Sequence, residues 1–112
     1  NEGNLSRDFT YIEDIINGIL STIENDPKDN KKYHLYNIGN SKPVKLMDFI
    51  DEIENATNNT ANKIMMPMQA GDVEITYADI TNLKDHYNYF PKTSIDIGVK
   101  SFVKWYKEYY KI

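Results

Sequence analysis

Apolar positions recur with helical spacing in three stretches of the chain. The clearest predicts a helix from about Tyr11 to Asn25, because its apolar residues follow the i, i+3, i+4, i+7 spacing of one buried stripe. The members of that stripe are Ile12, Ile15, Ile16, Ile19, Leu20 and Ile23. Pro27 follows the predicted helix end, as expected of a residue that cannot continue the hydrogen-bond ladder.

The other helical stretches lie in the middle and at the end of the chain. A helix is predicted from about Lys45 to Thr57, and its apolar face consists of Leu46, Phe49, Ile50 and Ile53. A last helix is predicted after Thr93, with Asp96 three residues on as a capping-box partner. Its stripe consists of Ile95, Val99, Phe102, Val103, Tyr106 and Tyr110. Asp79 is a good N-cap residue, so a short helix is expected from there to about Tyr87.

Two segments are rich in residues that favour strands. The aromatic run at residues 33–38 predicts a strand that a turn at Gly39 and Asn40 closes. The apolar run at residues 63–67 predicts a second strand that stops at its proline. Residues 69–72 read as a polar turn, and residues 73–78 as extended or irregular. The order helix–strand–helix–strand–helix–helix predicts a small α/β domain, and 112 residues are long enough for one core.

Composition and charge exclude several classes of protein. The chain has 13 Lys+Arg against 17 Asp+Glu, a net charge of -4, and its lysines are scattered. A nucleic-acid partner would require a clustered basic face, so none is expected. The absence of cysteine excludes disulfides, and no apolar run approaches the ~20 residues of a membrane span. No signal peptide is recognisable, which predicts a cytoplasmic protein, and the start at Asn1 indicates a piece of a longer chain.

Catalytic and metal-binding patterns are missing from the sequence. His34 and His86 are far apart, and neither has a carboxylate or second histidine at ligand spacing, so no metal site is expected. None of the nine tyrosines is followed four positions later by lysine, and no P-loop or Gly-x-Ser-x-Gly elbow is present. The aromatic residues near the end are expected to serve packing rather than sugar binding; they are Trp105, Tyr106, Tyr109 and Tyr110.

Two polar residues stand apart from the core pattern. Arg7 is the sole arginine, and its planar fork of donors suits a phosphate, although composition alone favours an ion pair with a nearby carboxylate. Asp72, in the polar turn, could accept hydrogen bonds from two neighbouring hydroxyls of a ribose. It could equally close a local Asx turn. The residues by themselves leave both alternatives open.

Five segments in this order resemble one known family. They are Ser-Arg-Asp-Phe-Thr-Tyr-Ile-Glu-Asp at residues 6–14, Tyr-Asn-Ile-Gly-Asn at 36–40, Pro-Met-Gln-Ala-Gly-Asp-Val at 67–73, Thr-Tyr-Ala-Asp at 76–79 and Phe-Val-Lys-Trp-Tyr at 102–106. Together they resemble the C-terminal part of an extended short-chain dehydrogenase/reductase, and within that family the UDP-glucuronate 4-epimerases. The resemblance covers nearly the whole chain.

The resemblance implies that residues 1–112 are one C-terminal substrate-binding domain, small and helix-rich with a few short strands, of a Rossmann-fold epimerase. The parent enzyme would hold NAD in an N-terminal Rossmann domain outside this sequence and would be a homodimer. It would convert UDP-glucuronate to UDP-galacturonate for capsule or lipopolysaccharide synthesis. The fragment alone would be inactive and would touch neither membrane nor nucleic acid. A UDP-glucuronate decarboxylase, a sugar-nucleotide 4,6-dehydratase and a non-enzymatic nucleotide-sugar binding module are the alternatives.

The resemblance also implies roles for four residues. Arg7 matches the arginine that contacts the diphosphate, which reverses the preference for a surface ion pair, and Asp72 matches the aspartate near the uridine ribose. Phe9 stands where UDP-galactose 4-epimerases usually have tyrosine, so one hydroxyl contact is lost. Gln69 stands where those enzymes have a second phosphate-binding arginine. The neutral glutamine lowers the positive charge near the diphosphate, and this departure favours the glucuronate branch.

Overall fold

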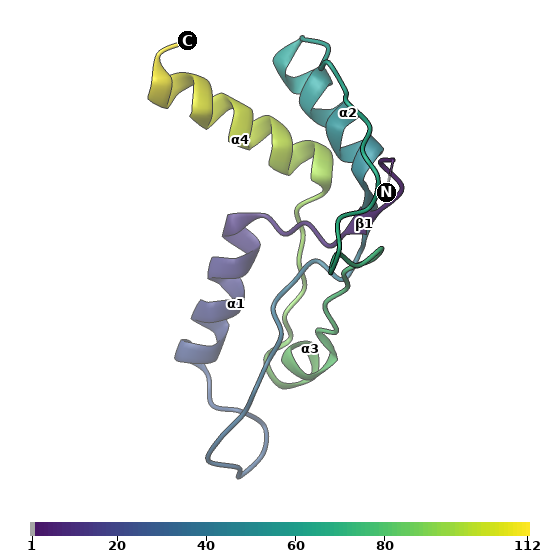
Figure 1. Ribbon diagram of the computed structural model, residues 1–112. Coiled ribbons are helices and arrows are strands. Elements are labelled where there is room, and N and C mark those ends of the chain that lie inside the picture. Colours follow the sequence, from purple (N-terminus) through teal and green to yellow (C-terminus); the bar gives the residue numbers. More distant parts are fainter. Residues whose placement is uncertain (1) are drawn as a thin grey trace.

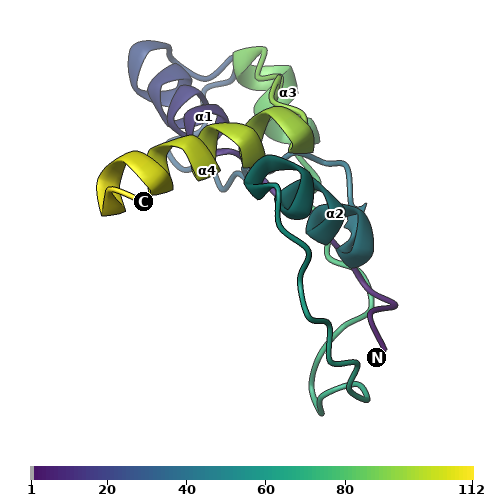
Figure 2. The same cartoon turned by 90° about the horizontal axis from the view of Figure 1, so that it is seen from above.

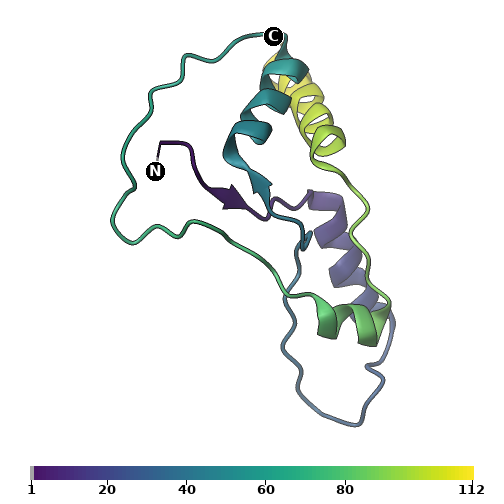
Figure 3. The same cartoon turned by 90° about the vertical axis from the view of Figure 1, so that its right-hand side faces the viewer.

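A computed structural model describes residues 2–112 as two helix pairs joined by a short strand pair (Figure 1). In chain order the elements are β1 (Ser6–Arg7), α1 (Ile12–Glu24), β2 (Val44–Lys45), α2 (Leu46–Thr57), α3 (Thr81–Tyr87) and α4 (Ile95–Tyr110). Helix α2 packs against α4, and α1 packs against α3. Figure 3 shows these two pairs at opposite ends of the molecule, with the strand pair between them.

The predicted helices are confirmed, and two of their caps differ from expectation. Helix α3 begins at Thr81, two residues after Asp79, whose carboxylate accepts the Thr81 backbone N–H at 3.0 Å and its hydroxyl at 2.6 Å. These bonds, the one from the hydroxyl first, lower the pKa of Asp79. The capping box is wrong, because the N-cap of α4 is Ser94 and its hydroxyl donates to the Asp96 carboxylate at 2.5 Å. Among residues 2–112, no helix has the length and apolar character needed to cross a membrane.

The two predicted strands are wrong, although the helix-rich α/β class with few short strands is confirmed. Neither residues 33–38 nor residues 63–67 form a strand in the described part of the chain. Aromatic and β-branched side chains favour a strand only where a neighbouring edge accepts its hydrogen bonds and a surface covers one face. Leu35 and Ile64, which would anchor these strands, remain 77% and 79% exposed. The predicted turn at residues 69–72 is confirmed, because the Asp72 N–H donates to the Gln69 carbonyl at 3.1 Å.

The observed strand pairing centres on Ser6. It pairs antiparallel with Lys45 of β2 and forms a parallel bridge with Ile75 on its other side. Its N–H donates to the carbonyl of Glu74 at 2.8 Å, and its carbonyl accepts from the N–H of Thr76 at 3.2 Å. Strand β1 therefore lies between β2 and residues 74–76, which places the next residue, Arg7, beside the turn at residues 69–72.

The chain buries less apolar surface than its pattern predicts. Its radius of gyration is 17.1 Å, whereas a compact chain of this length has about 13 Å. In residues 2–112 the buried apolar side chains are Leu83, Tyr89, Val99 and Val103. The predicted buried stripe of α1 is therefore wrong: most of it is exposed, up to 73% for Ile23. In the described residues the main helix partner of α1 is α3, and this packing leaves most of the stripe uncovered. Figure 2 shows that the C-terminal turns of α4 also project beyond α2.

A buried carboxylate on α1 connects the two helix pairs. Asp14 is 4% exposed, and its two oxygens accept the backbone N–H groups of Lys92 and Thr93 at 3.1 and 3.0 Å. A buried carboxylate needs such donors, because leaving it without partners would cost several kcal/mol. Asp14 thereby fixes the start of α4 against α1.

We expect Gly39→Ala to destabilise the fold by about 1–3 kcal/mol, the range for overpacking a tight contact. A Cβ at position 39 would lie 2.4 Å from the Cβ of Ala78 and 3.0 Å from an Asp8 carboxylate oxygen. The clash would separate residues 39 and 78. Urea unfolding measures the effect as a lower midpoint at constant slope.

Gly71→Ala is the matched control for Gly39→Ala. Its Cβ would meet no atom within 4 Å, although its φ of +86° favours glycine. The control therefore reports backbone strain without a steric clash, and we expect it to cost about 1 kcal/mol. Equal losses in the two variants would contradict the clash at position 39.

Candidate functional site

Arg7 and Asp72 meet although 65 residues separate them in the sequence. Nη2 of Arg7 lies 3.3 Å from Oδ1 of Asp72, and Nη1 donates to the carbonyls of Ser6 at 3.0 Å and Glu74 at 3.3 Å. The ion pair that composition favoured is therefore present. A guanidinium has five N–H donors, and these contacts engage three of them. The Arg7 side chain is 23% exposed, so these contacts do not enclose it completely.

A backbone hydrogen bond closes the turn that carries Asp72, so the Asp72 carboxylate is available to other partners. The N–H of Asp72 closes the turn on the Gln69 carbonyl, and Gly71 between them has a φ of +86°. Glycine adopts this left-handed conformation at low cost, so the turn suits its sequence. One carboxylate oxygen of Asp72 holds Arg7, and a carboxylate has further lone pairs for hydroxyl groups.

Asp8 holds together the segments around the site and was missed by the sequence reasoning. Its Oδ2 accepts the N–H groups of Ser41 and Ala78, both at 3.0 Å, and its Oδ1 accepts that of Lys42 at 3.3 Å. Its own N–H donates to the Thr76 hydroxyl at 3.1 Å. One side chain therefore ties the segment after β1 to residues 41–42 and 76–78. The signal available in the sequence was an acidic residue directly after the sole arginine.

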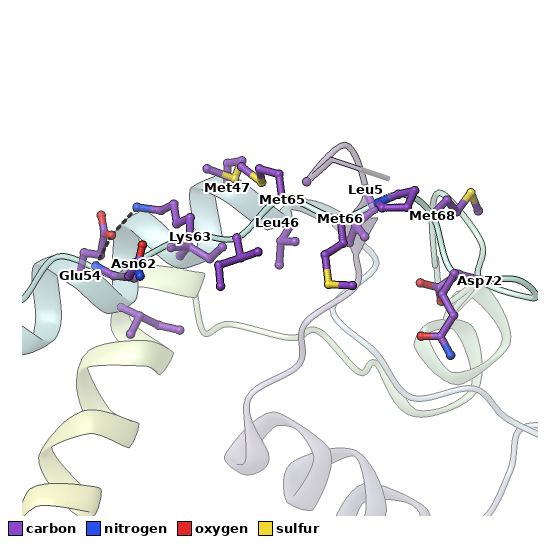
Figure 4. A pocket seen from close by; sticks show the side chains of 17 residues that line it. Leu5, Leu46, Met47, Glu54, Asn62, Lys63, Met65, Met66, Met68 and Asp72 are labelled. Carbon is purple, nitrogen blue, oxygen red and sulfur yellow. Dashed lines mark hydrogen bonds and ion pairs between the residues drawn. The ribbon is translucent and has the colours of Figure 1, made fainter.

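A cavity of about 500 Å³ lies between α2 and the segment at residues 61–69 (Figure 4). Its lining is mainly apolar and includes Leu5, Leu46, Met47, Ile50 and Met65. Figure 4 shows Asp72 at one end of the cavity and the ion pair of Glu54 with Lys63 at the other. That ion pair is the main cause of the lowered pKa of Glu54. Gln69 lines the same cavity as Asp72, so the structure brings Arg7, Asp72 and Gln69 to one place.

Phe9 lies in the packing between helices and lines a different cavity. Its ring stacks on Phe49 of α2 with centroids 4.0 Å apart and planes at 13°. This second cavity, of about 390 Å³, is lined by residues of α1, α2 and α4, including Ile12, Ile53 and Phe102. The structure therefore places Phe9 apart from the other three candidate residues. Its role as a substrate contact stays a prediction.

The aromatic residues of α4 form an exposed face rather than a core. Trp105 stacks on Tyr109 at 5.4 Å, and Tyr106 contacts Tyr110 at 4.6 Å. Each of these side chains is 42–65% exposed. They pack on one another at the surface, so Tyr106 and Tyr110 of the predicted apolar stripe do not belong to the core.

The two histidines, which the sequence separates widely, lie side by side. The ring centroids of His34 and His86 are 5.4 Å apart, and a ring nitrogen of each lies near the Asp29 carboxylate. The expectation that neither histidine has a ligand-type neighbour is therefore wrong. Spacing along the chain gave no signal, because the contact joins a loop residue to α3.

The described residues contain no motif for binding a dinucleotide cofactor. Its pyrophosphate would need a glycine-rich turn between a strand and a helix N-terminus. Within residues 2–112, β1 leads to α1 through Asp8, Phe9, Thr10 and Tyr11, and β2 leads directly to α2.

Comparison with known proteins finds relatives over nearly the whole chain, while no model of a known protein family matches it. An uncharacterized protein of Methanocaldococcus jannaschii is 48% identical over 108 residues, which are 96% of this chain and 32% of that protein. UDP-glucuronate 4-epimerase 2 of Arabidopsis thaliana is 34% identical over 121 residues, covering 99% of this chain and 28% of that enzyme. The chain thus spans about a third of the length of the curated relatives it matches.

A solved structure shares the fold and supports the same relationship. The crystal structure of UDP-glucuronic acid 4-epimerase from Bacillus cereus, in complex with UDP-glucuronic acid and NAD, matches with a TM-score of 0.85 and 29% identity. The match covers 98% of this chain and 34% of the enzyme. The matching regions are the C-terminal parts of these proteins.

Proposed function

We propose, on the premise that this chain is homologous to the C-terminal parts of UDP-glucuronate 4-epimerases, that it is the nucleotide-sugar-binding part of such an epimerase. The parent enzyme would be NAD-dependent and would interconvert UDP-glucuronate and UDP-galacturonate. The observation that carries the proposal is the TM-score of 0.85, over 98% of this chain, to an epimerase structure holding UDP-glucuronic acid and NAD. The joint position of Arg7 and Asp72 supports it independently.

Arg7 and Asp72 would hold the two polar parts of UDP. The N–H groups of Arg7 that make no other contact would bind the diphosphate. A charged, planar guanidinium is well suited to this ligand. Asp72 would accept hydrogen bonds from the ribose hydroxyls while keeping Arg7 oriented through the 3.3 Å contact. Gln69, which lines the same cavity as Asp72, would add a neutral amide near the diphosphate.

The contribution of this chain to the reaction would be anchoring. When bound in the N-terminal domain, NAD would accept and return the hydride of sugar carbon 4. Inversion requires the sugar to turn over between these two events, while the UDP end stays in place. Binding energy from UDP, which does not react, would thereby hold the reacting carbon close to the cofactor. Of the titratable side chains that line this cavity, Asp72 contacts Arg7, whereas Glu54 and Lys63 pair with each other at its other end.

The N-terminal Rossmann domain would also be the partner that this fold needs. The exposed isoleucines of α1 and the extended shape leave apolar surface that a neighbouring domain would cover. The parent enzyme would be a homodimer in the cytoplasm. It would supply UDP-galacturonate for capsule or lipopolysaccharide synthesis.

The intact protein with UDP-glucuronate and NAD tests the proposed function. Proton NMR of the sugar is expected to show UDP-galacturonate accumulating to equilibrium without loss of carbon. Release of carbon dioxide with formation of a pentose would instead identify a decarboxylase. A protein that binds UDP-glucuronate and leaves it unchanged would be a binding module, and the epimerase proposal would be wrong.

Residues 1–112 alone are expected to bind UDP very weakly or not detectably. The cleft would be shared between two domains, so the isolated chain would offer only one of its walls. Calorimetry of the fragment and of the intact protein under the same conditions measures the difference, and circular dichroism verifies that the fragment is helical. Micromolar binding by the fragment alone would contradict a shared cleft.

A further inference from the structure

A cluster of metal-ligating side chains lies at the opposite end of the molecule from the cavity beside α2. Asp29 and His34 come from the connection between α1 and β2, and His86 comes from α3. One ligand atom from each of the three side chains lies within 4.8 Å of the other two. A carboxylate with two imidazoles is a donor set that zinc and related divalent ions use in proteins.

The contacts of His34 mark where a cation would lie. Its Nε2 is 3.1 Å from Oδ1 of Asp29 and 3.1 Å from the backbone carbonyl of Lys31. Both oxygens are acceptors, so these contacts suit the tautomer with a proton on Nε2 that points between them. A metal ion that replaces this proton would meet one nitrogen and up to two oxygens that already converge on it.

His86 is held by a partner that would orient it as a ligand. Its Nδ1 lies 2.6 Å from the Tyr36 hydroxyl, and Tyr36 in turn packs edge-on against Tyr87 at 5.4 Å and parallel to His34 at 5.6 Å. For Nε2 of His86 to ligate a metal, Nδ1 would carry the ring proton and donate it to the Tyr36 oxygen. Metal-binding histidines commonly have such a hydrogen bond on the second ring nitrogen, which fixes the ring and its tautomer.

Asp29 supplies the negative charge of the cluster. The backbone N–H of Lys31 donates to its Oδ1 at 2.9 Å and holds the carboxylate in place. The opposing charge is the Lys31 ammonium, 4.0 Å from Oδ2. Because this side chain is 77% exposed, it can turn into solvent when a cation binds.

We propose that Asp29, His34 and His86 form a binding site for a divalent transition-metal ion of the zinc class. Tetrahedral zinc with bonds of about 2.1 Å separates its ligand atoms by about 3.4 Å, so the three side chains draw together on binding. Two of them lie on a loop that can make this movement, and water completes the coordination. Magnesium and calcium, which prefer all-oxygen ligands, do not fit this site. The bound ion joins the loop after α1 to α3.

Zinc titration of the intact protein, produced without a histidine tag, tests the site. Calorimetry is expected to show one binding event that weakens at least about 10-fold in each of His34→Asn, His86→Asn and Asp29→Asn. Asp26→Asn is the matched control, because Asp26 lies on the same loop, is exposed and is outside the cluster. Zinc is also expected to raise the melting temperature of the wild type and not that of the double histidine variant.

Two further measurements separate metal ligation from a structural effect. Tyr36→Phe keeps the ring and removes the hydroxyl, and it is expected to weaken zinc about 10-fold through the loss of the bond to His86. Cobalt(II) is expected to give visible absorption bands that disappear in the His34 variant, even if that variant melts like the wild type. Equal zinc affinity in the wild type and the double histidine variant would overturn the site, as would an equal effect of magnesium. Because UDP binding does not involve these residues, this result stands apart from the proposed epimerase function.

Discussion

Replacing Arg7 by alanine in the intact enzyme is expected to weaken UDP binding by ~1.5–3 kcal/mol, the loss typical of a charge-assisted hydrogen bond. This corresponds to about 10- to 150-fold in Kd. Arg7 already has its guanidinium fixed by the carbonyls of Ser6 and Glu74 and by the Asp72 carboxylate. The site is therefore ordered before the ligand arrives, and little of the binding energy is lost in ordering the side chain. Calorimetry with UDP measures the change directly.

Three comparison variants make the Arg7 result specific. Arg7→Lys keeps the charge without the planar fork, so its affinity is expected to fall between those of the wild type and the alanine variant. Lys45→Ala removes one positive charge from the exposed partner of Ser6 and controls for a general electrostatic effect, with affinity expected to stay unchanged. Asp72→Asn keeps an acceptor and loses the ion pair, so it is expected to weaken UDP less than Arg7→Ala. An alanine variant with wild-type affinity would remove Arg7 from the site.

The long helices could be predicted because their signal is local. In α1 and α2 the spacing of apolar residues and the flanking Pro27 and Asn58 determine the element, and both helices appear within about one residue of expectation. Strand pairing is not local. Ser6 pairs with residues 39 and 69 positions further along the chain, and no property of a six-residue window indicates that its neighbours will be Lys45 and Ile75.

Burial shows the second limit of the sequence pattern. The isoleucine stripe of α1 was correctly read as amphipathic, but periodicity says which face is apolar and not what covers it. With Ile12 60% and Ile23 73% exposed, the covering surface is not in the described chain. The sequence pattern of a domain that packs on another domain therefore overstates the core that it forms alone.

The candidate site could be predicted only in part, because only some of its residues stand out in the local sequence. Arg7 is noticeable because it is the sole arginine, and Asp72 because it follows a glycine in a polar turn. Asp8 gave only the weaker signal of an acidic residue directly after that arginine, since its partners are backbone N–H groups, which every residue except proline carries. The pair of His34 and His86 was missed because only the fold brings a loop and a helix together.

Replacing Asp8 by alanine is expected to lower the free energy of unfolding by about 2–4 kcal/mol, because backbone donors that lose their acceptor carry the desolvation penalty. The bonds from Ser41 and Ala78 are partly buried and account for most of the loss, while the bond from Lys42 is exposed. Asp8→Asn can keep one oxygen at the Oδ2 position and satisfy the two partly buried donors. The amide of this variant then points an N–H at the Lys42 N–H, which loses its acceptor. We therefore expect Asp8→Asn to lower the free energy of unfolding by about 1 kcal/mol.

The readouts for Asp8 distinguish an anchor from a ligand contact. Asp8 ties residues 41–42 and 76–78 to β1, and Arg7 depends on that framework through its bond to the Glu74 carbonyl. Asp8→Ala is therefore expected to lower both the urea midpoint and UDP affinity, whereas Arg7→Ala lowers mainly affinity. Asp51→Ala, an exposed carboxylate on α2, controls for loss of charge and is expected to stay within about 0.5 kcal/mol of wild type. If Asp8→Ala unfolds at the wild-type midpoint, its three backbone bonds do not hold these segments together, because an anchor cannot be removed without cost to the structure it fixes.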